Sequence, residues 1–379
     1  MRKETKAIQT PFQKRDAYGS LSFPVYNTAA YEFDTAHDMT EAFSGRVLEP
    51  DYSRVMNPTV AYFENRVKAL SGAENVFAMN TGMAAILNAL LVFAEAGKTI
   101  VTSNHLFGNT YALITKTLAR LGVKAQIADL TDTETLDRTI ADDACLIFAE
   151  YITNPQLEVV DLKKLSQVAH KHGVPLIVDT TIVPFTELNA REQGVDVEVL
   201  SSTKYISGGA TSLGGLILDY GTFEQVNKRI RFEFLFNIGS YMTPQVAYMQ
   251  TLGLETLNVR YQKQAQNALD LARALQKLPE VKRVNYPGLV QGVKIGAMLT
   301  IDLESEQKCF DFINRLKLIR RATNLFDNKS LAIHPYSTIF VGFTPEEKKN
   351  MDVLDTTIRL SMGLEDVEDL LEDIEQALK

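Results

Sequence analysis

Short apolar runs alternate with longer amphipathic stretches through the middle of the chain. The apolar runs are rich in Val, Ile and Leu, which is typical of strands that are buried on both faces of a sheet. The stretches between them carry apolar residues at helical spacing, and strands separated by helices predict a mostly parallel sheet with crossover helices. The expected strands are 76–79, 99–102, 124–128, 146–149, 176–179, 197–200 and 215–218, and the expected helices are 59–71, 82–96, 109–121, 161–172 and 222–232.

The pattern changes toward both ends of the chain. Residues 1–60 contain several prolines and tyrosines and little periodicity, so we expect an extended arm there. Residues 61–243 carry the alternating pattern and are expected to form an α/β domain. Residues 244–379 are expected to form a smaller α+β domain, with helices over 244–278, 306–316 and 365–379 and strands near 281–285 and 296–303.

Composition narrows the class of protein. The chain has 379 residues, of which 45% are apolar, so it can bury a sizeable core. Its net charge of −8 argues against nucleic acid as the main partner. No apolar run approaches membrane-spanning length, and the start MRKETKAIQT lacks the apolar core of a signal peptide. Cys145 and Cys309 lie far apart and the five histidines lack ligand spacing, so we expect a cytoplasmic protein with reduced thiols and no metal.

The lysine in the segment SSTKYISGG, Lys204, has neighbours that are unusual for a surface lysine. It follows the predicted strand 197–200 and stands between small hydroxyl side chains and two glycines. Residues of these types surround phosphate groups, and Ser201 and Thr203 could bind phosphate oxygens. The alternative is that the same hydroxyls form a local turn before the glycines.

Two further polar features stand at strand ends or helix starts. Asp179 closes the apolar run PLIVD, where a carboxylate is costly without a cationic partner, although it could also cap a helix or turn. Gly82 and Met83 open a helix after VFAMNT, and the free N–H groups of a helix start suit a phosphate. Ligands of open α/β sheets bind at the carboxyl ends of the strands, so we expect these features to lie together.

A lysine, a strand-end carboxylate and a phosphate-binding helix start are together the parts that hold pyridoxal 5'-phosphate. The lysine forms a Schiff base with the aldehyde, the carboxylate keeps the ring nitrogen protonated, and the helix start and hydroxyls hold the phosphate. Burial beside a cationic ring favours the neutral amine that Lys204 needs for this chemistry. The conjunction therefore predicts a pyridoxal-phosphate enzyme.

In their order along the chain, these segments resemble the pyridoxal-phosphate enzymes of cysteine and methionine metabolism. That family includes cystathionine synthases and lyases, methionine gamma-lyases and homoserine-ester sulfhydrylases. The resemblance implies the type I aminotransferase-like fold and a homotetramer with sites shared between subunits. The matching segments are DYSRVMNPT (51–59), NTGMAAI (80–86), NHLFGNTY (104–111), EYITNP (150–155), VDTTIVPF (178–185), SSTKYISGG (201–209) and IRLSMGLED (358–366).

The resemblance also implies a role for each matching residue. Lys204 would carry the cofactor and shuttle protons, Asp179 would pair with the ring nitrogen, and Arg359 would bind the substrate carboxylate through a two-pronged hydrogen bond. The cofactor would also be contacted by Gly82, Met83, Phe107, Asn154, Thr181, Ser201 and Thr203, by Tyr52 and Arg54 of a neighbouring subunit, and the substrate by Asn324.

Several of these residues could also have a purely structural role that involves no ligand. From the residues alone, the Tyr52 and Arg54 pair could belong to a surface loop, Asn154 to an Asn-Pro turn, and Arg359 to a solvated salt bridge. However, Arg359 stands between Ile358 and Leu360, which is not an obviously wet position.

Departures from the family pattern bear on the substrate. Phe107 stands where most relatives have a tyrosine, and phenylalanine can stack but cannot donate a proton to a leaving group. Acetate leaves as a stable anion without a proton donor, and GGATSLGG (208–215) is closer to the sulfhydrylases than to the lyases. The sequence therefore favours replacement at the γ-carbon of O-acetylhomoserine by sulfide or a thiol, giving homocysteine or methionine.

Two alternatives remain at the level of the sequence. The first is elimination by a methionine gamma-lyase or a cystathionine gamma- or beta-lyase, which shares its early steps with γ-replacement. The second is a catalytically inactive paralogue that still binds the cofactor, because Phe107, and Thr180 in place of the usual asparagine, depart from the family.

Overall fold

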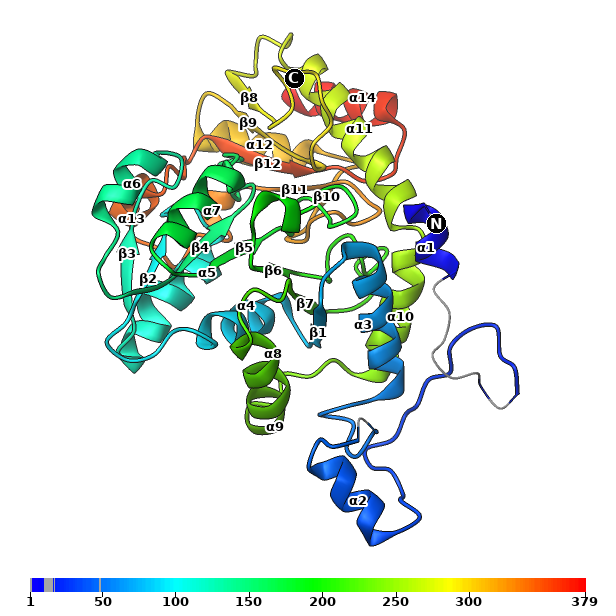
Figure 1. The fold of residues 1–379 in the computed structure, drawn as a ribbon. Coiled ribbons are helices and arrows are strands. Elements are labelled where there is room, and N and C mark those ends of the chain that lie inside the picture. Colours follow the sequence, from blue (N-terminus) through cyan, green and yellow to red (C-terminus); the bar gives the residue numbers. More distant parts are fainter. Residues whose placement is uncertain (1, 10–15, 17, 48) are drawn as a thin grey trace.

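A computed structural model describes residues 2–9, 16, 18–47 and 49–379 of the protein (Figure 1). Within the arm expected over 1–60, residues 1, 10–15, 17 and 48 therefore lie outside the described residues. The rest of the chain builds two sheets, and Figure 1 shows the smaller one stacked above the larger.

The larger sheet has seven strands in the order β1-β7-β6-β5-β4-β2-β3. Strands β2 to β6 pair in parallel, whereas β7 runs antiparallel to both of its neighbours. This confirms the mostly parallel α/β fold expected from the sequence. The strands are β1 (Asn75–Met79), β2 (Thr99–Thr102), β3 (Lys124–Ile127), β4 (Ala144–Glu150), β5 (Leu176–Asp179), β6 (Val197–Leu200) and β7 (Gly215–Asp219).

Helices cover both faces of this sheet because its strands are apolar on both sides. Ile177 of β5 packs in one core cluster with α4, while Leu176 and Val178 pack in the other with α7. Side-chain caps set the helix starts: Thr81 accepts a hydrogen bond at the start of α4, and Asp161 does so at α7. The helices of this region are α3 (Pro58–Ser71), α4 (Gly82–Leu91), α5 (Gly108–Ala112), α6 (Thr133–Thr139), α7 (Leu162–Lys171), α8 (Gln225–Arg229) and α9 (Leu235–Asn237).

The smaller sheet has five strands in the order β10-β11-β12-β9-β8. Helices α11, α12 and α14 share its apolar core. The elements of this region are α10 (Pro244–Glu255), α11 (Leu257–Leu275), β8 (Arg283–Asn285), β9 (Met298–Asp302), α12 (Glu306–Arg315), β10 (Arg320–Arg321), β11 (Leu331–Ile333), α13 (Pro345–Asn350), β12 (Thr357–Ser361) and α14 (Val367–Leu378).

Several expected helices differ in the structure. The helix expected over 244–278 is broken at Thr256, whose φ of −107° and ψ of 6° are not helical. The break leaves the Gly253 carbonyl free to accept a hydrogen bond from Arg260 Nη2 at 2.6 Å. The helix expected over 82–96 ends at Leu91, and the one expected over 109–121 passes from α5 into a π-helical and then a 3₁₀ turn.

The sequence analysis also missed whole elements. Helices α1 (Lys3–Gln9) and α2 (Ala36–Phe43) form inside the expected arm, and the Thr35 hydroxyl accepts a hydrogen bond from the Asp38 N–H to begin α2. The short strands β10 and β11 were missed as well, because two or three residues carry no readable alternation. Over the described ranges, no helix is both long and apolar enough to span a membrane.

Candidate active site

A cavity of about 670 Å³ lies at the carboxyl ends of the parallel strands, and residues of β12 and of the segments between the strands of the smaller sheet close its other side. Most of the residues expected to bind a ligand meet there, although they are far apart in sequence. The expected residues that line this cavity are Gly82, Met83, Phe107, Asn154, Asp179, Thr181, Ser201, Thr203, Lys204 and Arg359.

The turn that carries Lys204 is held in place from behind. Arg260 of α11 donates a hydrogen bond to the carbonyl of Tyr205 at 2.6 Å. Helix α10 lies so close to the turn that any side chain at Gly253 would collide with the Ile206 carbonyl oxygen. Because both helices fix the backbone that directly follows it, Lys204 extends into the cavity from a rigid support.

The pKa of the Lys204 amine lies close to neutral pH. Its Nζ donates a hydrogen bond to Asn324 Oδ1 at 2.8 Å, which places the expected substrate residue Asn324 beside it. Burial and then the charge of Arg359 lower the pKa of Lys204 to about 8, against the opposing effect of Asp179. Roughly a tenth of the amines are therefore neutral at pH 7, which is the form that can react or accept a proton.

Two carboxylates enter the cavity from adjacent strands. Asp179 ends β5, and its Oδ1 accepts a hydrogen bond from the Thr181 N–H at 2.8 Å. Glu150 ends β4 and is the register partner of Asp179. Burial raises the pKa of both groups, and Asp179 raises that of Glu150 further. No role was predicted for Glu150, although it ends the run LIFAE as Asp179 ends PLIVD.

Arg359, in the middle of β12, is a buried cation without a counter-charge. It is 3% exposed, and among the described residues no carboxylate lies within 4.0 Å of it. Its Nη1 donates to Asn154 Oδ1 at 3.1 Å and its Nη2 to the Asn324 carbonyl at 3.4 Å, while its Nε has no hydrogen-bond partner. Such a group can bind a carboxylate that a ligand brings into the cavity.

The start of α4 forms a second site that suits an anion. Thr81 caps the helix through a 3.0 Å hydrogen bond from the Ala84 N–H, and the first N–H groups of the helix have no acceptor within it. A Cβ atom at Gly82 would lie 2.7 Å from the Ser201 Cβ. Glycine is therefore required for the helix start to approach the end of β6.

These groups fit pyridoxal phosphate. The helix start at Gly82, with the hydroxyl groups of Ser201 and Thr203, suits the phosphate; Asp179 suits a protonated ring nitrogen; Lys204 suits the aldehyde. Phe107 lines the same cavity and supplies an aromatic face. No cluster of His, Cys, Asp and Glu suited to a metal ion occurs in the part of the chain that the structure describes.

Tyr52 and Arg54 are not part of this cavity. They line a separate one of about 370 Å³ together with Asn27 and Tyr241. Arg54 donates hydrogen bonds to the carbonyls of Leu235 and Phe236, and Tyr52 is 44% exposed. Their contact with a neighbouring subunit stays a prediction.

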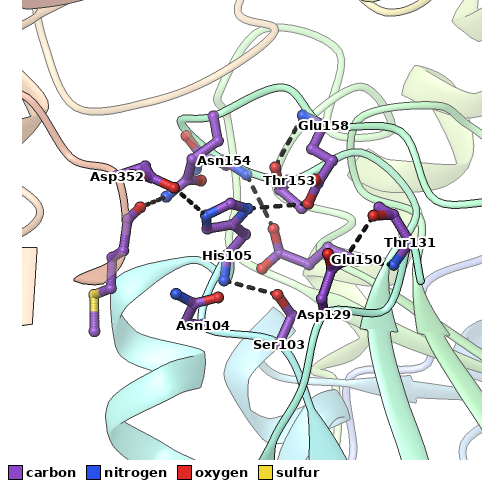
Figure 2. A network of polar contacts seen from close by, with 12 residues as sticks. Ser103, Asn104, His105, Asp129, Thr131, Glu150, Thr153, Asn154, Glu158 and Asp352 are labelled. Atoms are coloured by element: carbon purple, nitrogen blue, oxygen red, sulfur yellow. Dashed lines mark hydrogen bonds and ion pairs between the residues drawn. The ribbon is translucent and has the colours of Figure 1, made fainter. Parts of the chain in front are cut away.

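A cluster of polar side chains beside the cavity connects the region of the larger sheet with the region of the smaller sheet (Figure 2). Figure 2 shows His105 between two carboxylates, with Nδ1 at 3.0 Å from Glu158 and Nε2 at 2.9 Å from Asp352. Gln156 donates to the Met351 carbonyl at 2.6 Å nearby. These contacts tie the segments that carry Phe107 and Asn154 to the segment that leads into β12. The sequence analysis gave His105 no role.

Comparison with known proteins places the chain in context. The sequence model of the family described as "Cys/Met metabolism PLP-dependent enzyme" matches residues 4–379. An L-methionine gamma-lyase of Pseudomonas putida is 34% identical, over 99% of this chain and 96% of that protein. An O-acetyl-L-homoserine sulfhydrylase of Leptospira meyeri is 32% identical, over 99% of this chain and 96% of that protein.

Solved structures show the same likeness. A crystal structure from Campylobacter jejuni, assigned as an O-acetylhomoserine (thiol)-lyase, superposes with a TM-score of 0.95. It is 31% identical, and the match covers 100% of each chain. That structure contains N'-pyridoxyl-lysine-5'-monophosphate.

Replacing Gly82 with alanine tests the anion site. The new Cβ would press on Ser201 and push the start of α4 away, so we expect Gly82→Ala to weaken the affinity for pyridoxal phosphate about tenfold or more. Gly342→Ala is the matched control, because nothing lies within 4 Å of a Cβ there. Equal cofactor dissociation constants in the two variants, measured by fluorescence titration, would contradict this assignment.

The pH dependence of stability tests the His105 cluster. Glu158 and then Asp352 raise the pKa of His105, so the cluster should stabilise the fold at pH below about 6.5 and lose that effect as pH rises through the folded-state pKa. We expect His105→Gln to lower the free energy of unfolding by about 1 kcal/mol at pH 6 and by less at pH 9. His37→Gln, at a side chain that is 80% exposed, is the control. A loss for His105→Gln that is the same at both pH values would refute the expectation.

Proposed function

The chain belongs to the family of pyridoxal-phosphate-dependent enzymes of cysteine and methionine metabolism, and we propose that it replaces the γ-substituent of O-acetylhomoserine with sulfide or a small thiol. The products would be homocysteine or methionine. Family membership confirms the resemblance found in the sequence and the expected cofactor. The substrate and the roles of single residues are the proposal.

One observation carries the proposal: the cavity that holds Lys204 also holds a buried, unpaired arginine. An amino-acid substrate brings the carboxylate that Arg359 lacks, and it would be oriented with its α-carbon toward the amine of Lys204. Asn154 and Asn324 hold the guanidinium from two sides, so its direction is set before a substrate arrives.

The residues of the cavity would have separate roles in γ-replacement. When bound, pyridoxal phosphate withdraws electrons from the substrate and so stabilises negative charge at its α-carbon. Lys204 Nζ would take the proton from the α-carbon and, after giving that proton up, one from the β-carbon; each transfer requires the neutral amine that its lowered pKa favours. Asp179 would keep the ring nitrogen protonated, and Gly82, Met83, Ser201 and Thr203 would bind the phosphate.

The walls of the cavity favour a substituent that leaves without help. Phe107 supplies a ring face but no proton, so a leaving group with a stable anion, such as acetate, suits the site better than a thiolate. Among the described residues that line the cavity, the only Lys or Arg side chains are Lys204 and Arg359. A succinyl ester would bring a second carboxylate without a third cation to receive it, so we favour the acetyl ester.

Elimination from methionine is the second candidate, and the 34% identity to a methionine gamma-lyase favours it. Leu213, Ile339 and Val341 give the cavity an apolar side that could receive a thioether. An inactive paralogue is disfavoured, because Lys204, Asp179 and Arg359 all face one cavity.

We further propose a homotetramer in which residues 1–60 form an arm on a neighbouring subunit, next to domains over 61–243 and 244–379. The exposed ring of Tyr52 supports a contact outside its own chain. Cys145 and Cys309 are both free, which supports the expected cytoplasmic location.

Turnover on a panel of substrates tests the proposed reaction. We expect the highest kcat/KM with O-acetylhomoserine plus sulfide, at least about tenfold lower values with O-succinylhomoserine because its second carboxylate would be buried unpaired, and little 2-keto acid from methionine. Rapid keto-acid release from methionine, with the ester inert, would establish elimination in its place.

Truncating Arg359 tests the carboxylate site. Because the Arg359→Ala variant loses a buried charged partner, we expect KM for the amino-acid substrate to rise about 100-fold while the absorbance spectrum of the bound cofactor is retained. Arg320→Ala, at an exposed arginine of the same sheet, should leave KM unchanged. An unchanged KM in Arg359→Ala would remove this residue from substrate binding.

A further inference from the structure

Glu150 is a buried acid of the cavity that the proposed reaction does not use. The residue is buried, at 6% exposure, and each of its two carboxylate oxygens accepts a hydrogen bond from a backbone N–H group. The Phe107 N–H donates to Oε1 at 2.6 Å, and the Asn154 N–H donates to Oε2 at 3.1 Å; Figure 2 draws the second bond. One side chain therefore joins two segments that each bring a residue to the cavity.

Each of these segments depends on the carboxylate. Phe107 stands at the start of α5, where no side chain of the helix's own provides a cap, and its N–H donates to the Glu150 carboxylate. Asn154 turns its side-chain oxygen to Arg359 Nη1 at 3.1 Å while its backbone N–H is held by Glu150. A chain of contacts therefore runs from Glu150 through Asn154 to the unpaired guanidinium.

We propose that Glu150 is a positioning residue for substrate recognition, which fixes the backbones of Phe107 and Asn154 and, through the Asn154 side chain, aims Arg359 at the substrate carboxylate. This rests on the proposed function in one respect, that Arg359 receives a carboxylate. It adds a residue that acts by setting the direction of Arg359.

The geometry favours this role over proton transfer by Glu150. A general acid or base needs an oxygen directed at the reacting atom, whereas both oxygens of Glu150 accept N–H bonds. The geometry also requires a carboxyl group with two oxygens that can accept. Glutamine has one oxygen to accept a bond and an NH₂ group that only donates, so one of the two backbone N–H groups would face another donor.

The experiment compares two ligands that differ only by a carboxylate. Norleucine and pentylamine serve as probes because neither carries a leaving group at the γ-carbon, and their binding to the holoenzyme is followed through the cofactor's absorbance. We expect Glu150→Gln to weaken norleucine binding about tenfold, the loss that a misdirected charge-assisted hydrogen bond causes, and pentylamine binding less than twofold.

Glu198→Gln is the matched control. Glu198 is also a buried acid of the larger sheet, but it accepts hydrogen bonds from the hydroxyls of Thr180 and Tyr220, which can rotate to suit an amide. It should leave both affinities within about twofold of the unmodified protein. Asn154→Ala keeps the backbone N–H that Glu150 binds and removes the side-chain contact to Arg359, so it should reproduce the selective loss for norleucine relative to pentylamine even if Glu150→Gln folds poorly.

A purely structural role for Glu150 predicts another result. If Glu150→Gln weakens the two ligands by the same factor, or if Asn154→Ala leaves their affinity ratio unchanged, the proposal is overturned. A failure of the proposed reaction looks different: turnover of O-acetylhomoserine would be absent while the unmodified protein still binds norleucine more tightly than pentylamine.

Discussion

The cavity depends on burying charges that the protein does not neutralise by itself. Lys204 and Arg359 enter it as cations, Asp179 and Glu150 as acids, and none of the four has an ion-pair partner within 4.0 Å among the described residues. Burial of unpaired charge is costly, and the shifted pKa values of these groups are its direct expression. A protonated ring nitrogen would supply a partner for Asp179 and a substrate carboxylate would supply one for Arg359, while a phosphate would occupy the helix start at Gly82. Cofactor and substrate would therefore bring partners that the protein itself lacks.

The topology of the fold brings these charged groups together in one cavity. Parallel pairing aligns the carboxyl ends of β4, β5 and β6, which brings Glu150, Asp179 and the turn of Lys204 to one edge of the sheet. The break between α10 and α11 then lets Arg260 hold that turn from behind. Arg359 comes from the other sheet, and the contacts around His105 tie the segment before β12 to the segment that carries Phe107. The two sheets therefore contribute opposite walls, and neither holds the complete set of groups.

Local patterns were enough to predict the strands of the larger sheet and the groups at their ends. Lys204, Asp179 and Gly82 could be found because each interrupts an apolar run or opens a helix, and such signals need no knowledge of distant residues. Glu150 gives the same signal but received no role, since its partners Phe107 and Asn154 are revealed only by the folded backbone. The break at Thr256 and the bond between His105 and Asp352 depend on contacts far apart in sequence. The placement of Tyr52 and Arg54 against a neighbouring subunit comes from the family resemblance and stays a prediction.

The covalent attachment of the cofactor to Lys204 is the central claim, and peptide mapping tests it most directly. The holoenzyme would be reduced with borohydride, digested with protease and examined by mass spectrometry. The account predicts that the phosphopyridoxyl mass appears on the peptide that contains Lys204, and that Lys204→Ala abolishes the label. A label on a different lysine, or an unmodified Lys204 peptide from protein that retains the cofactor, would contradict it.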